Sequence, residues 1–293
     1  DTQGEYSLAI GAAAGSSSQS SYSIALGVSA GQSNQGSNSI SIGLTAGTTS
    51  QLSDSIAIGN SAGNDNQGYS AIAIGTNSGE TSQGSNCIAL GNGSGFDSQS
   101  QESVAIGSFA GYSSQGTYAF ASGYEAGRSN QGTGGVAIGY QAGRINQNPN
   151  SVAIGRAAAT SNQGSQAIAL GNGAGFTSQT SRAIAVGYNA GQNNQQASAI
   201  AIGTISGQTS QGSNSIAIGY NSGNQDQSSN AIAIGDNSGY SNQDQYAIAI
   251  GSSAGNQDQS LNAIAIGDNS GYSNQEQYAI AVSYTHLTLP TKA

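Results

Sequence analysis

Short apolar phrases recur along the chain at a fixed interval. In residues 214–229, NSIAIGYNSGNQDQSS, small and large side chains alternate over Ser215–Ile218, which is the period-two pattern of a β-strand. A glycine closes this phrase, and its equivalents follow at one constant spacing, from Gly11 and Gly27 through to Gly267. The pattern predicts one turn of a repeating β structure for every such interval.

Stacking of such units favours a solenoid. Equivalent strands of successive units would pair at about 4.8 Å and place identical side chains in columns. We therefore predict an all-β fold, a single-chain parallel β-solenoid of about 17 coils with a 16-residue period, over residues 1–282.

The two faces of the predicted strand differ in side-chain size. Ile216 and Ile218 share one face, and we predict that this face forms the core. The opposite face carries Ala217, and its equivalents are all Ala except Ser41. A flat stripe of small residues favours close packing against a second copy, so we predict the Ala column as the interface of a homo-oligomer with parallel subunits.

A glutamine recurs with the same period as the glycine, from Gln3 to Gln275, without substitution. A turn glutamine that served only solubility would drift to other polar residues. The invariance predicts a buried or half-buried ladder of amides that hydrogen-bond along the axis, with a structural role. Representative members of this ladder are Gln19, Gln35, Gln131, Gln147, Gln163, Gln211, Gln227 and Gln243.

Composition narrows the function. The net charge is −9 and the four arginines are scattered, so no basic stripe is available for nucleic acid. No apolar run reaches the roughly 20 residues that span a bilayer. Before residue 283 there is no histidine and a single cysteine, Cys87, so no Cys/His or Ser/His pair can form. We predict a non-enzymatic protein with no metal and no cofactor.

Aromatic residues occupy two variable columns, directly after each of two glycines of the repeat. We interpret them as candidate exposed binding residues for a sugar or protein ligand; alternatively, they cover glycine-rich backbone. The candidates are Tyr112, Tyr124, Tyr140, Tyr188, Tyr220, Tyr240 and Tyr272. Arg128 and Arg144 lie one coil apart and are interpreted mainly as surface charge, with the capacity to hold an anionic group.

Two phrases, NSVAIG and NSIAIG, resemble the head-repeat motif of YadA-like trimeric autotransporter adhesins. The matching residues are Asn150, Ser151, Val152, Ala153, Ile154 and Gly155, and Asn214, Ser215, Ile216, Ala217, Ile218 and Gly219. The resemblance covers residues 3 to about 282. It implies a left-handed parallel β-roll, a parallel homotrimer and an extracellular location, with an outer-membrane anchor outside this chain.

The repeat departs from that family in one respect, because the family's head repeat is slightly shorter. Sixteen-residue repeats with a glutamine turn also resemble fibre proteins of viruses and phages. We therefore expect the head of a surface adhesin that attaches to a protein or glycan of host or neighbouring cells; the alternative is a viral or phage receptor-binding fibre. An ice-binding solenoid is less favoured, because it requires regular threonine columns and these columns vary.

The end of the chain breaks the repeat. The period requires glycine at position 283, where the chain has Ser283, and residues 282–293 resemble a translated sequencing-library adapter. We interpret residues 283–293 as a non-native tail and residues 1–282 as a gene fragment that is open at both ends.

Overall fold

The computed structural model describes residues 3–283, and the strands within this range are each three residues long. The chain divides into two compact units, Asp1–Gln166 and Ala167–Ala293. Nearly all of the predicted tail, residues 284–293, lies outside the described residues.

One strand of each coil carries the apolar phrase. In the first unit these strands are β1 (Leu8–Ile10), β3 (Ile24–Leu26), β5 (Ile40–Ile42), β6 (Ile56–Ile58), β8 (Ile72–Ile74), β10 (Ile88–Leu90), β12 (Val104–Ile106), β14 (Phe120–Ser122), β16 (Val136–Ile138) and β18 (Val152–Ile154). In the second unit they are β20 (Ile168–Leu170), β22 (Ile184–Val186), β23 (Ile200–Ile202), β25 (Ile216–Ile218), β27 (Ile232–Ile234), β29 (Ile248–Ile250), β31 (Ile264–Ile266) and β33 (Ile280–Val282).

Most coils have a second strand, which ends on the invariant glutamine; before Gln51 and Gln195 there are only isolated bridges, at Thr49 and Asn193. In the first unit these strands are β2 (Ser17–Gln19), β4 (Ser33–Gln35), β7 (Asp65–Gln67), β9 (Thr81–Gln83), β11 (Asp97–Gln99), β13 (Ser113–Gln115), β15 (Ser129–Gln131), β17 (Ile145–Gln147) and β19 (Ser161–Gln163). In the second unit they are β21 (Thr177–Gln179), β24 (Thr209–Gln211), β26 (Gln225–Gln227), β28 (Ser241–Gln243), β30 (Gln257–Gln259) and β32 (Ser273–Gln275).

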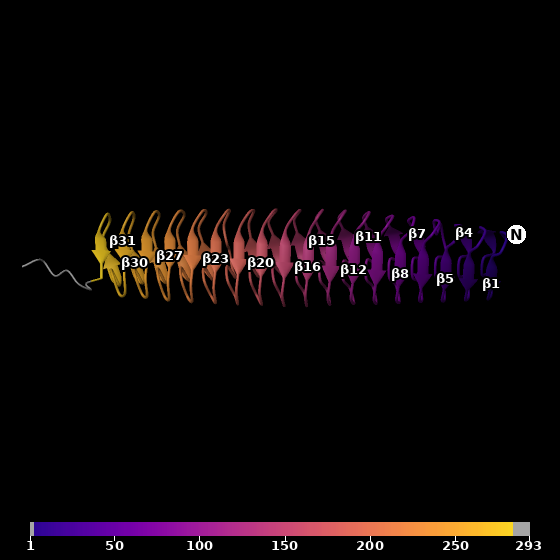
Figure 1. Ribbon diagram of the computed structural model, residues 1–293, viewed down its shortest axis with the longest axis horizontal. Coiled ribbons are helices and arrows are strands. Elements are labelled where there is room, and N and C mark those ends of the chain that lie inside the picture. The colour runs from indigo at the N-terminus through magenta and orange to yellow at the C-terminus, as the bar shows by residue number, and fades with distance from the viewer. Residues whose placement is uncertain (1–2, 284–293) are drawn as a thin grey trace, which may run out of the picture. The chain divides into compact units, whose positions relative to one another are not determined.

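Equivalent strands of successive coils pair in parallel and in the predicted register (Figure 1). In the second unit, Ala201 of β23 pairs with Ala217 of β25, and Gln211 of β24 pairs with Gln227 of β26. Within residues 3–283 the structure contains no helix. The prediction of an all-β parallel solenoid of about 17 turns with a 16-residue period is confirmed.

The prediction of which strand face forms the core was wrong. Ala153 and Ala217 are fully buried inside the coil of a single chain, whereas Ile154 on the same strand as Ala153 is 38% exposed. The Ala column therefore cannot be a subunit interface, and the isoleucine columns do not fill the interior.

The narrow interior explains this arrangement. A β-carbon added at Gly207 would lie 2.7 Å from Oε1 of Gln211 and 3.2 Å from the β-carbon of Ala201. Glycine, alanine and an extended glutamine thus already meet at contact distance across the coil. A coil this short leaves no room inside for two large aliphatic side chains, so these point outward.

The glycine that closes the apolar strand is required for two reasons. Gly219 has a φ of +130°, and a β-carbon there would lie 2.4 Å from the carbonyl oxygen of Gly235 in the next coil. Any side chain would therefore meet both backbone strain and a clash with the adjacent turn.

Besides the second glycine (Gly223, φ 51°), three further corners of each coil use the left-handed backbone conformation. In the coil around strand β26 they are Asn221, Asp226 and Asn230, with φ between 51° and 60°. Asn and Asp adopt this conformation more readily than most residues. The chain therefore turns at predictable positions.

Candidate functional site

The invariant glutamines form a ladder inside each unit. Gln131 Nε2 donates to the carbonyl oxygen of Phe120 across the same coil, at 3.0 Å, and to Oε1 of Gln147 in the next coil, at 3.1 Å. All eight ladder glutamines singled out from the sequence are 2% exposed or less. Their side chains hold the two sheets together and have no access to a ligand.

Ser41 shows how the interior tolerates an exception. Its hydroxyl accepts from Gln35 Nε2 at 3.3 Å and donates to Gln51 Oε1 at 2.6 Å. The hydroxyl of Ser41 therefore bridges Gln35 and Gln51, two successive glutamines of the ladder. The only departure from alanine in this column is polar because it lies beside the amides.

The two adhesin-like phrases contain both interior and surface residues. Ser151 and Ala153 are buried, as are Ser215 and Ala217, while Gly155 and Gly219 close the strand. Asn150 and Asn214 are exposed corner residues with φ of 58° and 56°. Partly exposed aliphatic positions complete each phrase, namely Val152, Ile154, Ile216 and Ile218. The motif therefore specifies the turn of the coil and leaves an apolar surface outside.

That apolar surface continues from coil to coil in both units. Two aliphatic side chains lie on the outer side of the sheet in the described coils, except in the coil of β14, which has Phe120 and Ser122 there. We call these two columns the isoleucine face. In the first unit the more exposed positions include Ile74, Ile106 and Ile138, at 37–39% exposure. In the second unit Ile250 and Ile266 are 37% and 45% exposed. Regular columns of this kind differ from the scattered apolar residues of an ordinary surface.

The candidate tyrosines lie at the surface, but their surroundings differ. Tyr124, Tyr140, Tyr188, Tyr220 and Tyr272 are exposed, and Tyr112 and Tyr240 are half-buried. In the first unit, the rings of Tyr124 and Tyr140 stack with centroids 5.3 Å apart. Tyr112 stacks on Phe96 at 4.7 Å.

Phe109 connects these two stacks. Its ring meets Tyr112 at a centroid distance of 5.7 Å and Tyr124 at 6.3 Å, in edge-on geometry in both cases. Sequence analysis did not single out Phe109. It lies at a left-handed corner, φ 58°, where most other coils carry Asn, Ser, Gly or Ala. A bulky residue at a position with positive φ is the signal that could have found it.

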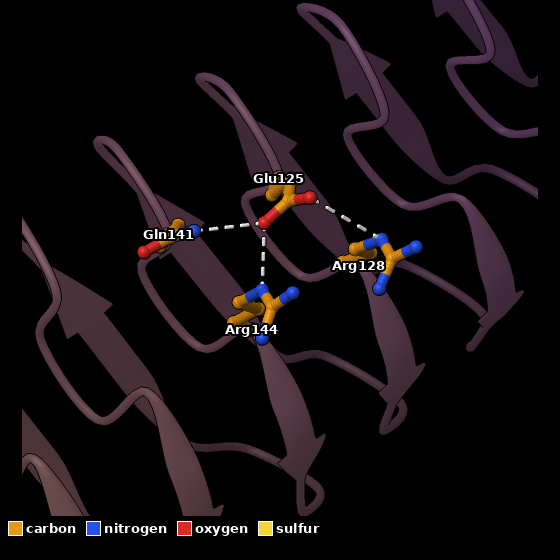
Figure 2. Close-up of polar contacts among 4 residues, drawn as sticks. All are labelled: Glu125, Arg128, Gln141 and Arg144. Carbon is orange, nitrogen blue, oxygen red and sulfur yellow. Dashed lines mark hydrogen bonds and ion pairs between the residues drawn. The ribbon is translucent and has the colours of Figure 1, made fainter.

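Two arginines share one carboxylate beside these rings (Figure 2). Arg144 Nε donates to Glu125 Oε2 at 2.7 Å, and Arg128 Nε lies 3.6 Å from Glu125 Oε1. Gln141 Nε2 also donates to Glu125 Oε2, at 2.9 Å. The sequence interpretation of the two arginines, mainly as surface charge with the capacity to hold an anionic group, did not identify Glu125 as the carboxylate between them.

The pKa of Glu125 lies below its ordinary value. Burial alone would raise this pKa, but hydrogen bonds from Gln141 and Arg144 and the positive charges of Arg144 and Arg128 outweigh that effect. Glu125 is therefore an ionised structural acceptor that fixes both guanidinium groups.

Cys87 is buried in one of the small-residue columns, where its Sγ contacts the carbonyl oxygen of Ser100 at 2.8 Å. Burial raises the pKa of this thiol, which disfavours the reactive thiolate. Among residues 3–283, no three His, Cys, Asp or Glu side chains gather where they could hold a metal ion. No helix of sufficient length and hydropathy to cross a membrane occurs in the described part of the chain.

Comparison of the chain with models of known protein families finds no match, and comparison with curated proteins finds none either. The resemblance to YadA-like heads thus depends on the repeat phrases and their period. What the fold defines is a repetitive parallel β-solenoid, consistent with a fibre or adhesin-like repeat protein.

Proposed function

We propose that this chain is the repetitive head or shaft of an extracellular adhesive fibre and that its copies associate in parallel through the isoleucine face. The observation that carries the proposal is the outward position of two aliphatic columns in both units. Burial of such columns gains about 25 cal/mol for each Å² of apolar surface removed from water. The proposal replaces the Ala column, which lies inside the coil, with the isoleucine face as the interface.

A second copy is the occupant that fits this face best. Nearly every described coil presents a pair of aliphatic side chains at the same spacing, so a parallel copy in register meets similar residues at almost every turn. A folded partner with an unrelated surface would match only a few coils. We propose a homotrimer, because three such faces can enclose a common apolar core and because the repeat phrases resemble those of trimeric adhesin heads.

Light scattering of residues 1–282 over a dilution series tests the association. We expect a stable threefold mass for the unaltered chain. The combined variant Ile218→Lys, Ile234→Lys and Ile250→Lys should lower this mass, because three ammonium groups would have to be buried in the interface. A folded monomer of the unaltered chain would overturn the proposed interface.

A matched control places the same charges on the opposite sheet. Gln225, Ser241 and Gln257 are outward positions that pair with one another in register on strands β26, β28 and β30. Their replacement by lysine should leave the oligomeric mass unchanged. Equal dissociation of both variants would show that added charge, and not the isoleucine face, controls assembly.

The adhesive role has a separate test. Beads coated with the assembled protein should be retained on cell surfaces or on extracellular matrix more strongly than beads coated with the heat-denatured chain. The repeated surface supports this role because many equivalent weak contacts along one fibre add to a strong attachment. Equal retention of both bead types contradicts adhesion while leaving the assembly result untouched.

A further inference from the structure

In one short part of the first unit, aromatic and arginine side chains gather along one edge of the coils. Residues 103–156 contain three of the four arginines that precede residue 283, together with one carboxylate, Glu125, although the whole chain has a net charge of −9. We call the surface formed here, with the adjoining ring of Phe96, the ring–arginine patch. It consists of Phe96, Phe109, Tyr112, Tyr124, Tyr140, Arg128, Arg144 and Arg156.

The rings of the patch hold two of its arginines in place. The guanidinium carbon of Arg128 lies 5.6 Å from the ring centroid of Tyr112, and that of Arg156 lies 6.0 Å from the ring centroid of Tyr140. Each stack of two rings therefore has a cation over one of its outer faces. The stacked rings restrict the motion of the guanidinium groups before any ligand arrives, which lowers the entropy cost of binding.

Glu125 positions Arg144 and also lies close to Arg128. Its contacts with Arg128 and Arg144 both involve Nε, and the terminal nitrogens of both guanidinium groups extend away from the carboxylate (Figure 2). The two arginine side chains keep 35% and 27% of their surface exposed, compared with 11% for Glu125. The carboxylate is thus largely enclosed, while both arginine side chains remain partly exposed.

The corner positions in this part of the chain support a specific role. Phe109, Glu125 and Gln141 all adopt the left-handed conformation, with φ of 58°, 53° and 56°. At most equivalent corners the chain uses Asn, Ser, Gly or Ala. Local rules of a fold are broken most often where function requires it. These three corners lie in consecutive coils: Phe109 contacts the ring of Tyr124, Glu125 accepts a hydrogen bond from Arg144, and Gln141 donates to Glu125.

We propose that the ring–arginine patch binds an acidic glycan, that is, an extended saccharide bearing carboxylate or sulfate groups. The planar donors of arginine match the oxygens of either anion. Tyrosine hydroxyl groups and the amide of Gln141 offer hydrogen bonds to neutral sugar hydroxyls. Because the patch follows successive coils along one edge, an extended chain can contact several arginines at once.

A protein ligand fits the patch less well. Protein interfaces are usually anchored by a side chain buried in a desolvated pocket. In the patch, the ring faces are partly occupied by each other and by arginine, which leaves less open ring surface for an apolar anchor.

Binding of the full chain to three immobilised polysaccharides tests the proposal. Heparin carries sulfate and carboxylate, hyaluronan carries carboxylate alone, and dextran is neutral. We expect salt-sensitive retention on heparin, and retention on hyaluronan as well identifies carboxylate as sufficient. No retention on either acidic polymer, or equal retention on dextran, overturns the proposal. Equal retention on poly-glutamate overturns the preference for a glycan.

Variants then locate the site. The combined change Arg128→Gln, Arg144→Gln, Arg156→Gln and Glu125→Gln removes the cations without leaving an unpaired carboxylate, and should weaken binding at least about tenfold. Arg182→Gln is the control, because Arg182 belongs to the second unit and lies outside the patch. The triple lysine variant of the three patch arginines keeps their charge and should still bind more weakly than the unaltered chain, since lysine lacks the planar fork.

Circular dichroism establishes that each variant retains its β structure. Unchanged binding by a folded variant without the patch arginines would overturn the site. The proposal is independent of self-association through the isoleucine face, since the patch lies within one chain. A monomeric chain that still binds the acidic polymer would leave this proposal in place even if the proposed assembly failed.

Discussion

Ala153 and Ile154 are neighbours on strand β18, yet they have opposite surroundings. Ala153 is fully buried against the ladder inside the coil, while Ile154 is 38% exposed on the isoleucine face. Both columns are regular over the chain, but for different reasons. The alanine column is regular because a larger side chain cannot fit, whereas nothing within a single chain requires the outer column to be aliphatic.

This difference changes how a regular column of a solenoid should be interpreted. Small residues repeated at one position indicate a narrow interior when they face the glutamine amides. Large apolar residues repeated on an outer face indicate a surface that binds another protein chain. The interior therefore explains the stability of one chain, and the outer face supports the proposed assembly.

The sharpest test of this comparison is a pair of substitutions on β18. Ala153→Arg would force a charged side chain into a filled interior and should destabilise the fold by more than about 4 kcal/mol. Ile154→Arg places the same side chain outside and should leave the single chain folded. Thermal unfolding followed by circular dichroism measures both. Similar melting temperatures for the two variants would contradict the assignment of inside and outside.

The glutamine ladder should give the next largest effect. In the combined variant Gln131→Glu and Gln147→Glu, carboxylates replace amides that donate to the carbonyl oxygens of Phe120 and Val136. Each buried carboxylate would lose these donor bonds and its burial would raise the pKa of the new carboxyl group. We expect a loss of about 2–4 kcal/mol at pH 7.

The sign of the pH dependence follows from the raised pKa. Stability should be greatest at low pH, where the carboxyls are protonated, and should fall as the pH rises through the raised pKa of the folded state. Gln245→Glu is the control, since Gln245 is exposed and should show little change. Denaturant titrations at pH 4 and pH 7 measure these differences. If the ladder variant is as stable as the control at pH 7, the ladder hydrogen bonds do not contribute measurably to the free energy of unfolding.

Much of the fold could be predicted from the sequence because the period is strict. The spacing of Gly219 and Gln227 from their equivalents determines the register of every strand pair, and the structure has that register. A period of two, however, only separates the two faces of a strand. It does not say which face is inside, and that choice depends on the width of the coil.

The width depends on corners that the apolar pattern does not reveal. Three left-handed corners per coil bring Ala217, Gln227 and the second glycine, Gly223, into contact. The uniformly small or invariant side chains of those columns were the available signal, and their joint appearance indicates a common interior.

The ring–arginine patch was harder to predict for a related reason. Arg144 and Glu125 are 19 residues apart, which is one coil plus one corner. The period predicts contacts between equivalent positions only, so a contact across a corner requires knowledge of the turn. Phe96 and Tyr112, which occupy equivalent positions, could be placed together from the sequence, whereas Phe109 could not.

The smallest expected effect on stability is that of Glu125→Gln. It tests whether Glu125 serves the patch or the structural interior of the coil. The lowered pKa means that the carboxylate stabilises the fold above the ordinary pKa of glutamate, and that this contribution is lost as the pH falls through the lower pKa of the folded state. Glu125→Gln should therefore change the free energy of unfolding by no more than about 1 kcal/mol at pH 7, because its arginine partners are partly exposed. Urea titrations at pH 7 and at successively lower pH should show a small difference from the unaltered chain at pH 7 that shrinks as the pH falls. A loss at pH 7 as large as that of the ladder variant would mean that Glu125 belongs to the structural framework of the coil, and that its arginines are not held ready for an external anion.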